Sequence, residues 1–350
     1  MNPDRSYWQD RRVVVTGGTG FLGGHLVRQL CGMGARVRVL ALPARTATAA
    51  DNDGTVELVN GDICDRSLVR SALADAEVVF HAAGIVAVWG PALKRLRNVH
   101  VQGTQNVLDA APSSARIVHT SSLVAVGATL SAVPLTEGAP FPANVAAIPY
   151  AAAKRESEEI ALGSGRDVVV TNPGTLIGPE DDEPSVMGRF CRRYWKGHIP
   201  FAPPGGFNFV DVRDVATAHL LAAEHGTRGE RYLLGGENHT FHSILALLAE
   251  VAGYRPRWSP QLSDRAMQLL AVAAETRSYW SGKEPYPSFG HVQINRLHWY
   301  CRSDRARTQL GFAPRPVRES LADAYVWHAQ WKPFQLGRIS RWWMRQRAAA

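Results

Sequence analysis

The sequence lacks the features that would cross-link it, bind a structural metal or hold it in a membrane. Its 350 residues include only four cysteines, and no two of them form a CxxC pair. This spacing argues against a disulfide framework and a zinc site, and it fits a reducing compartment. No run reaches about 18 apolar residues, so we expect no transmembrane helix. Residues 1–12 are polar and charged rather than signal-like, so we expect a cytoplasmic protein.

The excess positive charge is concentrated at the C-terminal end. The formal net charge is +8, but residues 332–350 hold one lysine, four arginines and no acid, which leaves +3 for the rest. We therefore predict no nucleic-acid partner. In this tail Leu336, Ile339 and Trp343 are interspersed with arginines. A basic helix with tryptophans can lie among anionic headgroups, so weak peripheral membrane contact is one hypothesis; a packed or frayed tail is the alternative.

What the sequence does have is a regular alternation of apolar β-rich runs and helical stretches. Apolar residues make up 45% of the chain, enough for a substantial core. The expected strands are Val13–Thr16, Val37–Leu40, Val56–Val59, Val78–His81, Ile117–Thr120 and Val168–Asn172. The expected helices are Phe21–Cys31, Leu93–Ala111 and one beginning near Pro149. This alternation predicts an α/β fold, a Rossmann-type doubly wound parallel sheet with helices on both faces.

The pattern loosens beyond about residue 175. Five prolines between 179 and 204 interrupt it, and helical segments such as Phe241–Ala252 and Leu262–Trp280 then dominate. We predict an NAD(P)-binding domain over residues 1–175 and a smaller, mostly helical substrate-binding cap over 176–331. The tail at 332–350 follows. Some segments of the second region, for example Arg231–Leu234, are expected to return to the main sheet.

A glycine-rich turn separates the first strand from the first helix. Gly18, Gly20 and Gly23 fit GxGxxG, and Gly17, Gly20 and Gly23 fit GxxGxxG. Glycines let the backbone turn sharply and approach a pyrophosphate, whose charge is met by amides at the helix N-terminus. A tight turn without a ligand is the alternative, but the strand before it and the helix after it favour a dinucleotide site.

The end of the second strand carries no acid that would bind a ribose 2′-hydroxyl and favour NAD. Positions 41 and 42 hold alanine and leucine, while Arg36, Arg38 and Arg45 lie nearby. These arginines could meet a 2′-phosphate or could be solvated charges, so we predict NAD(P) with a slight preference for NADP(H). Asp62, after the third strand, is either an adenine contact or the cap of the next helix.

Tyr150 and Lys154 lie four residues apart on an expected helix, so their side chains share one face. An ammonium beside a phenol favours the phenolate, so we expect the pKa of Tyr150 to be lowered toward neutrality. Such a tyrosine exchanges a proton with a carbonyl or alcohol oxygen during hydride transfer. Ser121 and Ser122 follow the strand Ile117–Thr120 and offer a hydroxyl to the substrate oxygen; a polar turn or helix cap is the alternative.

With these residues placed, the chain resembles the extended short-chain dehydrogenases/reductases, the NAD-dependent epimerase/dehydratase group. The stretches that carry this resemblance are Thr16–Gly23, Gly61-Asp62, His81–Ala83, Gly103-Thr104, Thr120–Ser122, Tyr150–Lys154, Asn172-Pro173, Gly178-Pro179, Val212–Val215 and Ser303–Pro314. Within the group, Asn172–Pro184 and Gly229–Asn238 are most similar to dihydroflavonol reductase-like and hopanoid-associated sugar epimerase-like proteins.

The resemblance implies roles for individual residues. Ser122, rather than Ser121, would form a catalytic triad with Tyr150 and Lys154, and no metal would be needed. The implied cofactor contacts are Gly17, Gly20, Phe21, Leu22, Gly23, Arg45, Asp62, Ile63, Ala82, Tyr150, Lys154 and Pro173. A homodimer formed by helix pairing is a further expectation.

Two positions depart from the family's pattern. A helix that commonly reads Val-Asn-Val-x-Gly-Thr has His100 in place of the asparagine. His100 either takes over the supporting role of that asparagine or is a packed or surface histidine. The segment Leu123–Gly127 lacks the tyrosine common in sugar-nucleotide epimerases, which favours a reductase of a less polar substrate.

Three functions are therefore weighed. The first is an NAD(P)-dependent oxidoreductase that moves hydride between the nicotinamide and a carbonyl or alcohol on a small, apolar substrate. The second is a sugar-nucleotide epimerase or dehydratase with transient hydride transfer, in which cap arginines would bind the diphosphate. The arginines available for that role are Arg189, Arg192, Arg193 and Arg231. The third is a dinucleotide-binding module without catalysis, against which the intact triad argues.

Overall fold

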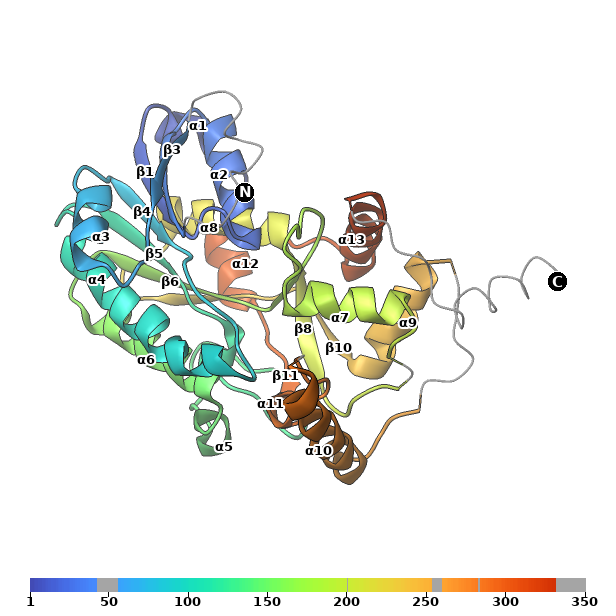
Figure 1. The fold of residues 1–350 in the computed structure, drawn as a ribbon. Helices are drawn as coiled ribbons and strands as arrows, with labels where there is room; N and C mark the ends of the chain where they lie inside the picture. The colour runs from blue at the N-terminus through green and yellow to red at the C-terminus, as the bar shows by residue number, and fades with distance from the viewer. Residues whose placement is uncertain (43–55, 200, 254–259, 283, 332–350) are drawn as a thin grey trace.

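The structure is a computed structural model that describes residues 1–42, 56–199, 201–253, 260–282 and 284–331. Arg45 and the basic tail at 332–350 lie outside the described residues, so the predictions made for them are not addressed. Figure 1 shows a main sheet with its helices on the left and a second unit, the cap, on the right. Within the described ranges, no helix combines the length and the apolar content needed to cross a bilayer.

The main sheet has seven parallel strands in the order β3-β2-β1-β4-β5-β6-β9. The strands are β1 (Arg12–Thr16), β2 (Arg36–Ala41), β3 (Val56–Asn60), β4 (Val78–His81), β5 (Arg116–Thr120), β6 (Val168–Pro173) and β9 (Arg231–Leu234). The chain runs outward from β1 in one direction and from β4 in the other. The strand order therefore reverses between β1 and β4, and in such sheets a ligand crevice forms at the carboxyl ends there.

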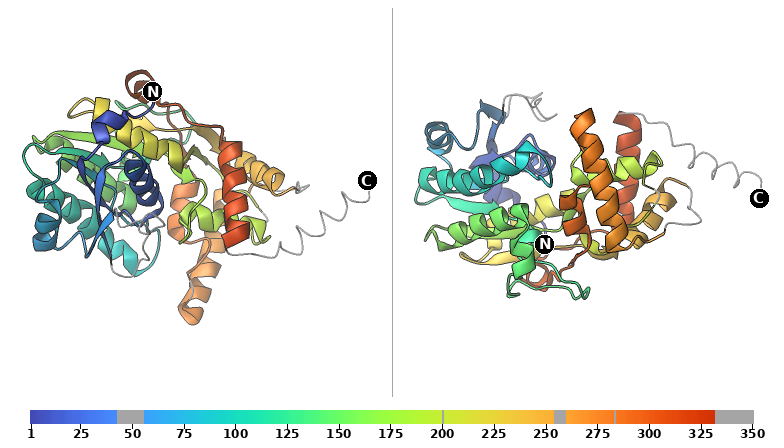
Figure 2. Two further views of the ribbon diagram at one scale, coloured as in Figure 1. Left: turned by 90° about the horizontal axis from the view of Figure 1, so that it is seen from above. Right: turned by 60° about the horizontal axis from the view of Figure 1, so that its bottom comes forward.

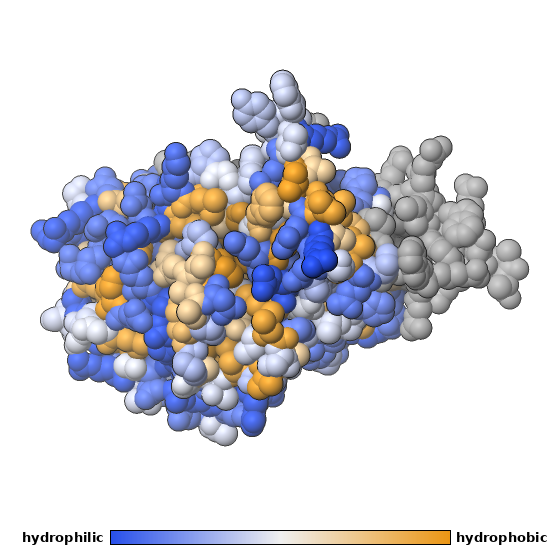
Figure 3. Space-filling view, turned by 90° about the horizontal axis from the view of Figure 1, so that it is seen from below, coloured by the Kyte–Doolittle hydropathy of each residue, from blue (hydrophilic) through white to orange (hydrophobic). Residues whose placement is uncertain are grey.

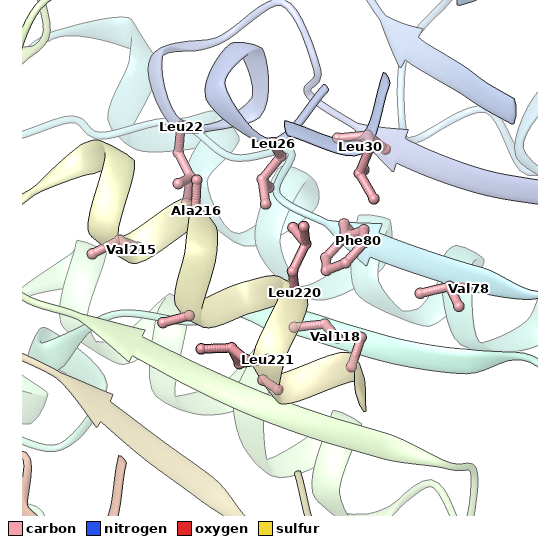
Figure 4. Close-up of a cluster of buried hydrophobic side chains, with 14 of the residues drawn as sticks. Leu22, Leu26, Leu30, Val78, Phe80, Val118, Val215, Ala216, Leu220 and Leu221 are labelled. Carbon is pink, nitrogen blue, oxygen red and sulfur yellow. The ribbon is translucent and has the colours of Figure 1, made fainter. Parts of the chain in front are cut away.

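Helices cover both faces of this sheet, as predicted. On one face lie α2 (Phe21–Gly32), α8 (Val212–His225) and α12 (Asp304–Leu310). On the other lie α3 (Arg66–Leu73), α4 (Gly103–Ala110) and α6 (Pro149–Gly163). Figure 4 shows how α2 and α8 pack: Leu26 points toward Leu220, and Phe80 of β4 lies beside Leu220. Burial on both faces explains why the strands are nearly continuous apolar runs.

The predicted helix over 93–111 is broken into three pieces. A 3-10 turn covers Pro91–Arg95, a π-helical turn covers Asn98–Gln102, and α4 follows. The amide of Gly103 reaches back to the carbonyl of Asn98, five residues earlier. The Thr104 hydroxyl donates to the His100 carbonyl (2.6 Å) and competes with the regular helical bond there. This turn presents His100 toward the end of the sheet.

The cap contains a small four-stranded sheet that the sequence analysis missed. Its central strand is β8 (Gly206–Asp211), which pairs with β7 (Thr175–Ile177), β10 (Glu237–Thr240) and β11 (His298–Trp299). The cap helices are α7 (Val186–Trp195), α9 (Phe241–Val251), α10 (Asp264–Ser281), α11 (Phe289–Asn295) and α13 (Val317–Trp331). The predicted boundary at residue 175 falls on the first residue of β7. As expected, Arg231–Leu234 returns to the main sheet as β9.

The cap sheet is hard to predict from the sequence, because its outer strands are short and its central strand has a buried polar side chain. Asn208 of β8 is fully buried; its amide oxygen accepts from the Gly236 amide (2.9 Å) and its amide group donates to Asn238 (2.8 Å). These bonds tie β8 to β10, so a residue that looks like a turn signal is here a cross-strand link. The remaining short elements are α1 (Arg5–Trp8), α5 (Ala143–Ala146) and a 3-10 turn at Leu123–Ala125.

Candidate active site

A cavity of about 990 Å³ lies along the carboxyl ends of the central strands and extends under the cap. Every predicted site residue that the structure describes lines it: Gly17, Gly20, Phe21, Leu22, Gly23, Asp62, Ile63, Ala82, Ser122, Tyr150, Lys154 and Pro173. Its volume lies at the upper end of the range for small-molecule and cofactor sites. One cavity thus adjoins both the glycine turn and the proton-transfer residues.

The glycine turn is closed so tightly that side chains are excluded. Gly17 has φ +71°, and a Cβ there would lie 2.8 Å from the Ala83 Cα. A Cβ on Gly23 would lie 2.1 Å from the Gly17 carbonyl oxygen. The N-cap of α2 is Gly20, which has no side chain to occupy the first amides of that helix. Backbone amides at a bare helix N-terminus, beside a cavity, fit the pyrophosphate of a dinucleotide.

A buried hydrogen-bond chain fixes this turn to the π-helical segment. The Ala83 amide donates to the Thr16 hydroxyl (3.1 Å), which lies 2.8 Å from Nδ1 of His81. Nε2 of His81 lies 3.1 Å from the Thr104 hydroxyl, which donates to the His100 carbonyl. Burial lowers the pKa of His81 to about 3, so the ring is neutral, with a donor at Nε2 and an acceptor at Nδ1. The chain stiffens the floor of the cavity.

The three predicted proton-transfer residues meet at the ends of β5 and α6. Lys154 Nζ donates to the carbonyl of Thr120 (2.9 Å), the last residue of β5. Ser122 lies beside the Tyr150 hydroxyl and acts to lower the pKa of that phenol. The hydroxyl of Ser121 is buried and meets no hydrogen-bond partner among the described residues. The structure thus brings Ser122, rather than its neighbour, to Tyr150.

The expected lowering of the Tyr150 pKa is wrong. Burial raises the pKa of this phenol to about 12, and Ser122 offsets only part of that effect. The Lys154 ammonium is directed at the Thr120 carbonyl, and its own pKa is lowered by burial to about 8, although Glu158 opposes the shift. Tyr150 therefore holds its proton at neutral pH and is set up as an acid rather than a phenolate.

A buried ionic network that the sequence analysis missed lies behind these residues. Glu158, one turn after Lys154 on α6, is fully buried and pairs with Arg231 of β9 (3.0 Å). Its other carboxylate oxygen accepts from the Asn172 amide (2.6 Å), which also donates to the Ser122 carbonyl (3.0 Å). The Lys-x-x-x-Glu spacing was the available signal. Arg231 thus forms an ion pair with Glu158 beside the main sheet and does not line the cavity.

Several other polar residues prove to be structural. Arg36 pairs with Asp10 (3.1 Å) and Arg38 with Glu57 (2.7 Å), so neither faces the cavity. Asp62 does not cap α3, because Asp65 does. The Asp62 carboxylate instead accepts from the Cys64 amide (3.0 Å) and pairs with Arg95 (3.2 Å). Unlike Arg36 and Arg38, the paired side chains of Asp62 and Arg95 line the cavity.

His100 is a packed, neutral side chain beside the tyrosine. Its Nε2 donates to the Ile85 carbonyl (2.8 Å), and its ring stands edge-on to Tyr150 with centroids 5.7 Å apart. Burial, with Lys154 as a further cause, lowers its pKa to about 3. A Cβ on Gly84 would lie 2.8 Å from the His100 ring, so a glycine there makes room for the imidazole. An imidazolium relay at this position is therefore excluded at neutral pH.

The cap contributes a mainly apolar wall with a few charges. Its apolar lining residues include Met187, Phe190, Phe207, Phe241, Ile294 and Trp299. Of the arginines weighed for a diphosphate, Arg189 and Arg193 line the cavity, whereas Arg192 lies against His328 (3.4 Å). The Arg193 guanidinium stacks over the Tyr286 ring at 4.5 Å.

The sequence model of the NAD dependent epimerase/dehydratase family matches residues 13–235. The chain belongs to this family. Sterol demethylase protein B of Methylococcus capsulatus is 36% identical to it over 90% of this chain and 97% of that protein. A putative dihydroflavonol 4-reductase of Synechocystis is 32% identical over 89% of this chain and 93% of its own length, which agrees with the predicted resemblance. The crystal structure of gox2253 has a TM-score of 0.80 at 30% identity and covers 93% of this chain and 100% of its own.

Membership of the NAD-dependent epimerase/dehydratase family makes a nicotinamide dinucleotide the cofactor and agrees with the doubly wound fold. When bound, the nicotinamide supplies or accepts a hydride. The residues of this chain that fit it are the backbone of the glycine turn at one end of the cavity and Tyr150 and Lys154 at the other. The cavity joins the two ends without interruption, as a bound dinucleotide requires.

Replacement of the buried Lys154 should remove activity but raise the stability of the fold. The pKa of Lys154 is about 8 in the folded protein, whereas an unperturbed lysine has a pKa of 10.5. Between these two pH values the unfolded chain therefore binds more protons than the folded protein. The wild type should therefore gain stability as pH rises from about 8 toward 10.5. Lys154→Met should abolish activity yet raise the free energy of unfolding near neutral pH by about 1 to 3 kcal/mol.

Guanidinium unfolding of both proteins at neutral and alkaline pH measures this effect. The difference in the free energy of unfolding between the wild type and Lys154→Met should become smaller as pH rises. If the methionine variant is less stable at every pH, the bond to Thr120 and the attraction of Glu158 outweigh the cost of burying Lys154.

Proposed function

We propose that this protein is an NADP(H)-preferring reductase of carbonyl groups on apolar, ring-containing substrates. One observation carries the proposal: Tyr150, whose pKa is raised by burial, and Ser122 line a cavity whose cap wall is mainly apolar and aromatic. A carbonyl in this position would have an acid at hand and apolar surface around the rest of the molecule.

The roles of the side chains follow from their contacts. The Ser122 hydroxyl, anchored by the bond from the Val124 amide (3.3 Å), orients the carbonyl oxygen of the substrate. Tyr150 donates its proton to that oxygen as the carbonyl carbon is reduced. The phenolate that remains is stabilised by Ser122, which acts to lower the pKa of the phenol. Glu158 keeps the charge of Lys154 from being lost to burial.

The substrate class is inferred from the cap and supported by the relatives. Phe190, Phe207 and Phe241 form an aromatic cluster, with Phe207 5.4 Å from Phe241 and stacked on Trp299 at 6.4 Å. Such a wall favours flat apolar ring systems. The names of the two relatives point to a sterol and a flavonoid, both of which are fused-ring molecules.

The preference for NADP(H) rests on the end of β2. An acidic residue there would repel a 2′-phosphate, and β2 ends at Ala41 followed by Leu42, which both line the cavity. Titration of the protein with NADPH and NADH should give tighter binding of NADPH by about tenfold or more. Equal affinities for the two cofactors, or tighter binding of NADH, would contradict the preference for NADP(H) but not the proposed reaction.

A sugar-nucleotide epimerase is the second candidate, because Arg189 and Arg193 line the cavity and could bind a diphosphate. The two functions differ in cofactor balance. A reductase consumes NADPH in proportion to the alcohol formed, whereas an epimerase inverts a sugar without net oxidation.

The discriminating experiment incubates the protein with NADPH and a panel of cyclic ketones, including 3-ketosteroids and dihydroflavonols, and in parallel with UDP- and dTDP-hexoses. We expect NADPH oxidation matched by alcohol formation with at least one ketone, and no change in the sugars. Inversion of a hexose without loss of NADPH would establish the epimerase. NADPH binding with no turnover of any compound would favour a binding module.

A further inference from the structure

The cap helix α10 projects from the body of the molecule (Figures 1 and 2). It has 18 residues and begins with a Ser263 cap that accepts from the Ala266 amide (3.3 Å). Only Met267, Ala271 and Ser278 on it are buried, and their spacing of four and seven residues places them on one side. That side faces α11, with which α10 packs.

The opposite side of α10 is apolar and exposed. Leu269 is 73% exposed, Val272 49% and Trp280 83%, and their successive spacings of three and eight residues align them along the helix. Ala273 and Thr276 lie in the same row, and Tyr279, 85% exposed, lies beside it. We call these six residues the outer face of α10. Exposed apolar rows of this length on a helix mark an interaction surface.

The charges around the outer face are of one sign. Arg265 precedes Leu269 by four residues and Arg277 precedes Trp280 by three, so both exposed arginines border the apolar row. The acids of the helix, Asp264 and Glu275, lie toward its other side, where the Glu275 carboxylate accepts from the Phe289 amide of α11 (2.8 Å). An apolar row with tryptophan and tyrosine, bordered by arginines alone, complements a surface of anionic headgroups over hydrocarbon.

The buried side of α10 packs on α11, a helix that lines the cavity. The loop after α10 and helix α11 supply Tyr286, His291, Ile294 and Asn295 to the cavity lining. Phe289, at the start of α11, is itself 44% exposed. In the space-filling view from below, the projecting part is drawn mainly in blue tones, and apolar surface lies at its base (Figure 3). A surface seated on the outer face of α10 would therefore be separated from the cavity wall by α10 and α11.

We propose that the outer face of α10 docks on the headgroup region of a bilayer that contains anionic lipids. The helix lies flat, Leu269 and Val272 enter the acyl boundary, Trp280 and Tyr279 sit at the headgroup level, and Arg265 and Arg277 meet phosphates. Docking would hold the protein at the phase in which an apolar substrate dissolves. The proposal extends the proposed function to the source of its substrate, but binding to lipid can be measured without catalysis.

The test is co-sedimentation of the full-length protein with phosphatidylcholine vesicles, with and without phosphatidylglycerol. Wild type should bind the mixed vesicles more tightly, and added salt should weaken binding. The double variant Leu269→Asp, Trp280→Asp should lose about a hundredfold in partition coefficient, since the acyl boundary loses Leu269 and the headgroup level loses Trp280. The matched control is Val326→Asp on α13, 50% exposed in the wild type, which should bind like the wild type.

Other outcomes overturn the proposal. The double variant binding like the wild type, or wild type remaining with the supernatant of both vesicles, rules out docking through α10. Loss of binding on truncation after residue 331, with α10 intact, assigns the contact to the C-terminal tail instead. If the double variant abolishes a wild-type dimer in sedimentation velocity without changing vesicle binding, the outer face meets a second copy.

A second double variant tests the proposal even if the aspartate variant does not fold. Arg265→Gln, Arg277→Gln changes only exposed positions and should remove the preference for anionic vesicles while a weaker apolar partition persists. Retention of this preference would contradict the proposed role of the arginines. All variants should keep the cofactor affinity and reduce a water-soluble ketone as the wild type does, so a failure of docking leaves the proposed reaction standing.

Discussion

Tyr150→Phe should lower kcat by about two to four orders of magnitude while leaving cofactor affinity nearly unchanged. The substitution removes one oxygen, the group that holds the transferable proton and lies beside Ser122. The ring keeps its packing against His100, with centroids 5.7 Å apart, so the fold should be retained. Steady-state kinetics with a ketone substrate, together with titration of NADPH, measure the two quantities separately.

The control for this prediction is a neighbouring hydroxyl that does not reach the phenol. Ser121→Ala removes a buried hydroxyl that has no hydrogen-bond partner among the described residues, so its kcat should stay close to the wild-type value. Equal losses in the two variants would mean that the site responds to any change at the end of β5. Full activity of Tyr150→Phe would remove the tyrosine from the mechanism.

Gly23→Ala should destroy cofactor binding. Its new Cβ would lie 2.1 Å from the Gly17 oxygen and 2.7 Å from the Gly18 Cα, and both are backbone atoms of the turn that would cradle the pyrophosphate. The turn or the start of α2 must therefore shift, at a cost of about 1 to 3 kcal/mol in the free energy of unfolding. We expect a loss of more than about a hundredfold in NADPH affinity, because the helix amides move with the turn.

The same helix offers a matched control. Gly32 is the last residue of α2, and a Cβ there meets nothing within 4 Å. Gly32→Ala should leave NADPH binding unchanged and raise the stability by up to about 1 kcal/mol, since alanine restricts the unfolded chain. Calorimetric titration and thermal unfolding of the two variants compare them directly. A Gly23→Ala protein with normal affinity would place the dinucleotide elsewhere.

The main sheet was predictable because each of its strands is a local apolar run. Burial on both faces gives β4, β5 and β6 each a run of two or more adjacent valine or isoleucine residues, and the glycine turn marks where β1 ends. The cap sheet was not predictable, because β8 carries a buried Asn208 and its partners are only two to four residues long. Its strands are defined by pairing with distant segments rather than by their own sequence.

The shared helix face of Tyr150 and Lys154 could be predicted, but the electrostatics of the two side chains could not. The spacing of Tyr150 and Lys154 places them on one helix face, yet it does not say where the ammonium points. The structure directs it to Thr120, and burial then raises the pKa of the phenol rather than lowering it. Likewise, Arg231 looks like a cap arginine in the sequence, and only the return of β9 to the main sheet brings it to Glu158.

The central claim is that Tyr150 and Ser122 support net reduction of a carbonyl on an apolar substrate. The most direct test uses NADPH that carries deuterium at the transferred position of the ring, with analysis of the product by mass spectrometry. The account predicts an alcohol containing one deuterium on the carbinol carbon, formed in step with oxidised cofactor and absent with Tyr150→Phe. A converted product with no deuterium, or inversion of a sugar nucleotide with the labelled cofactor unchanged, would contradict it.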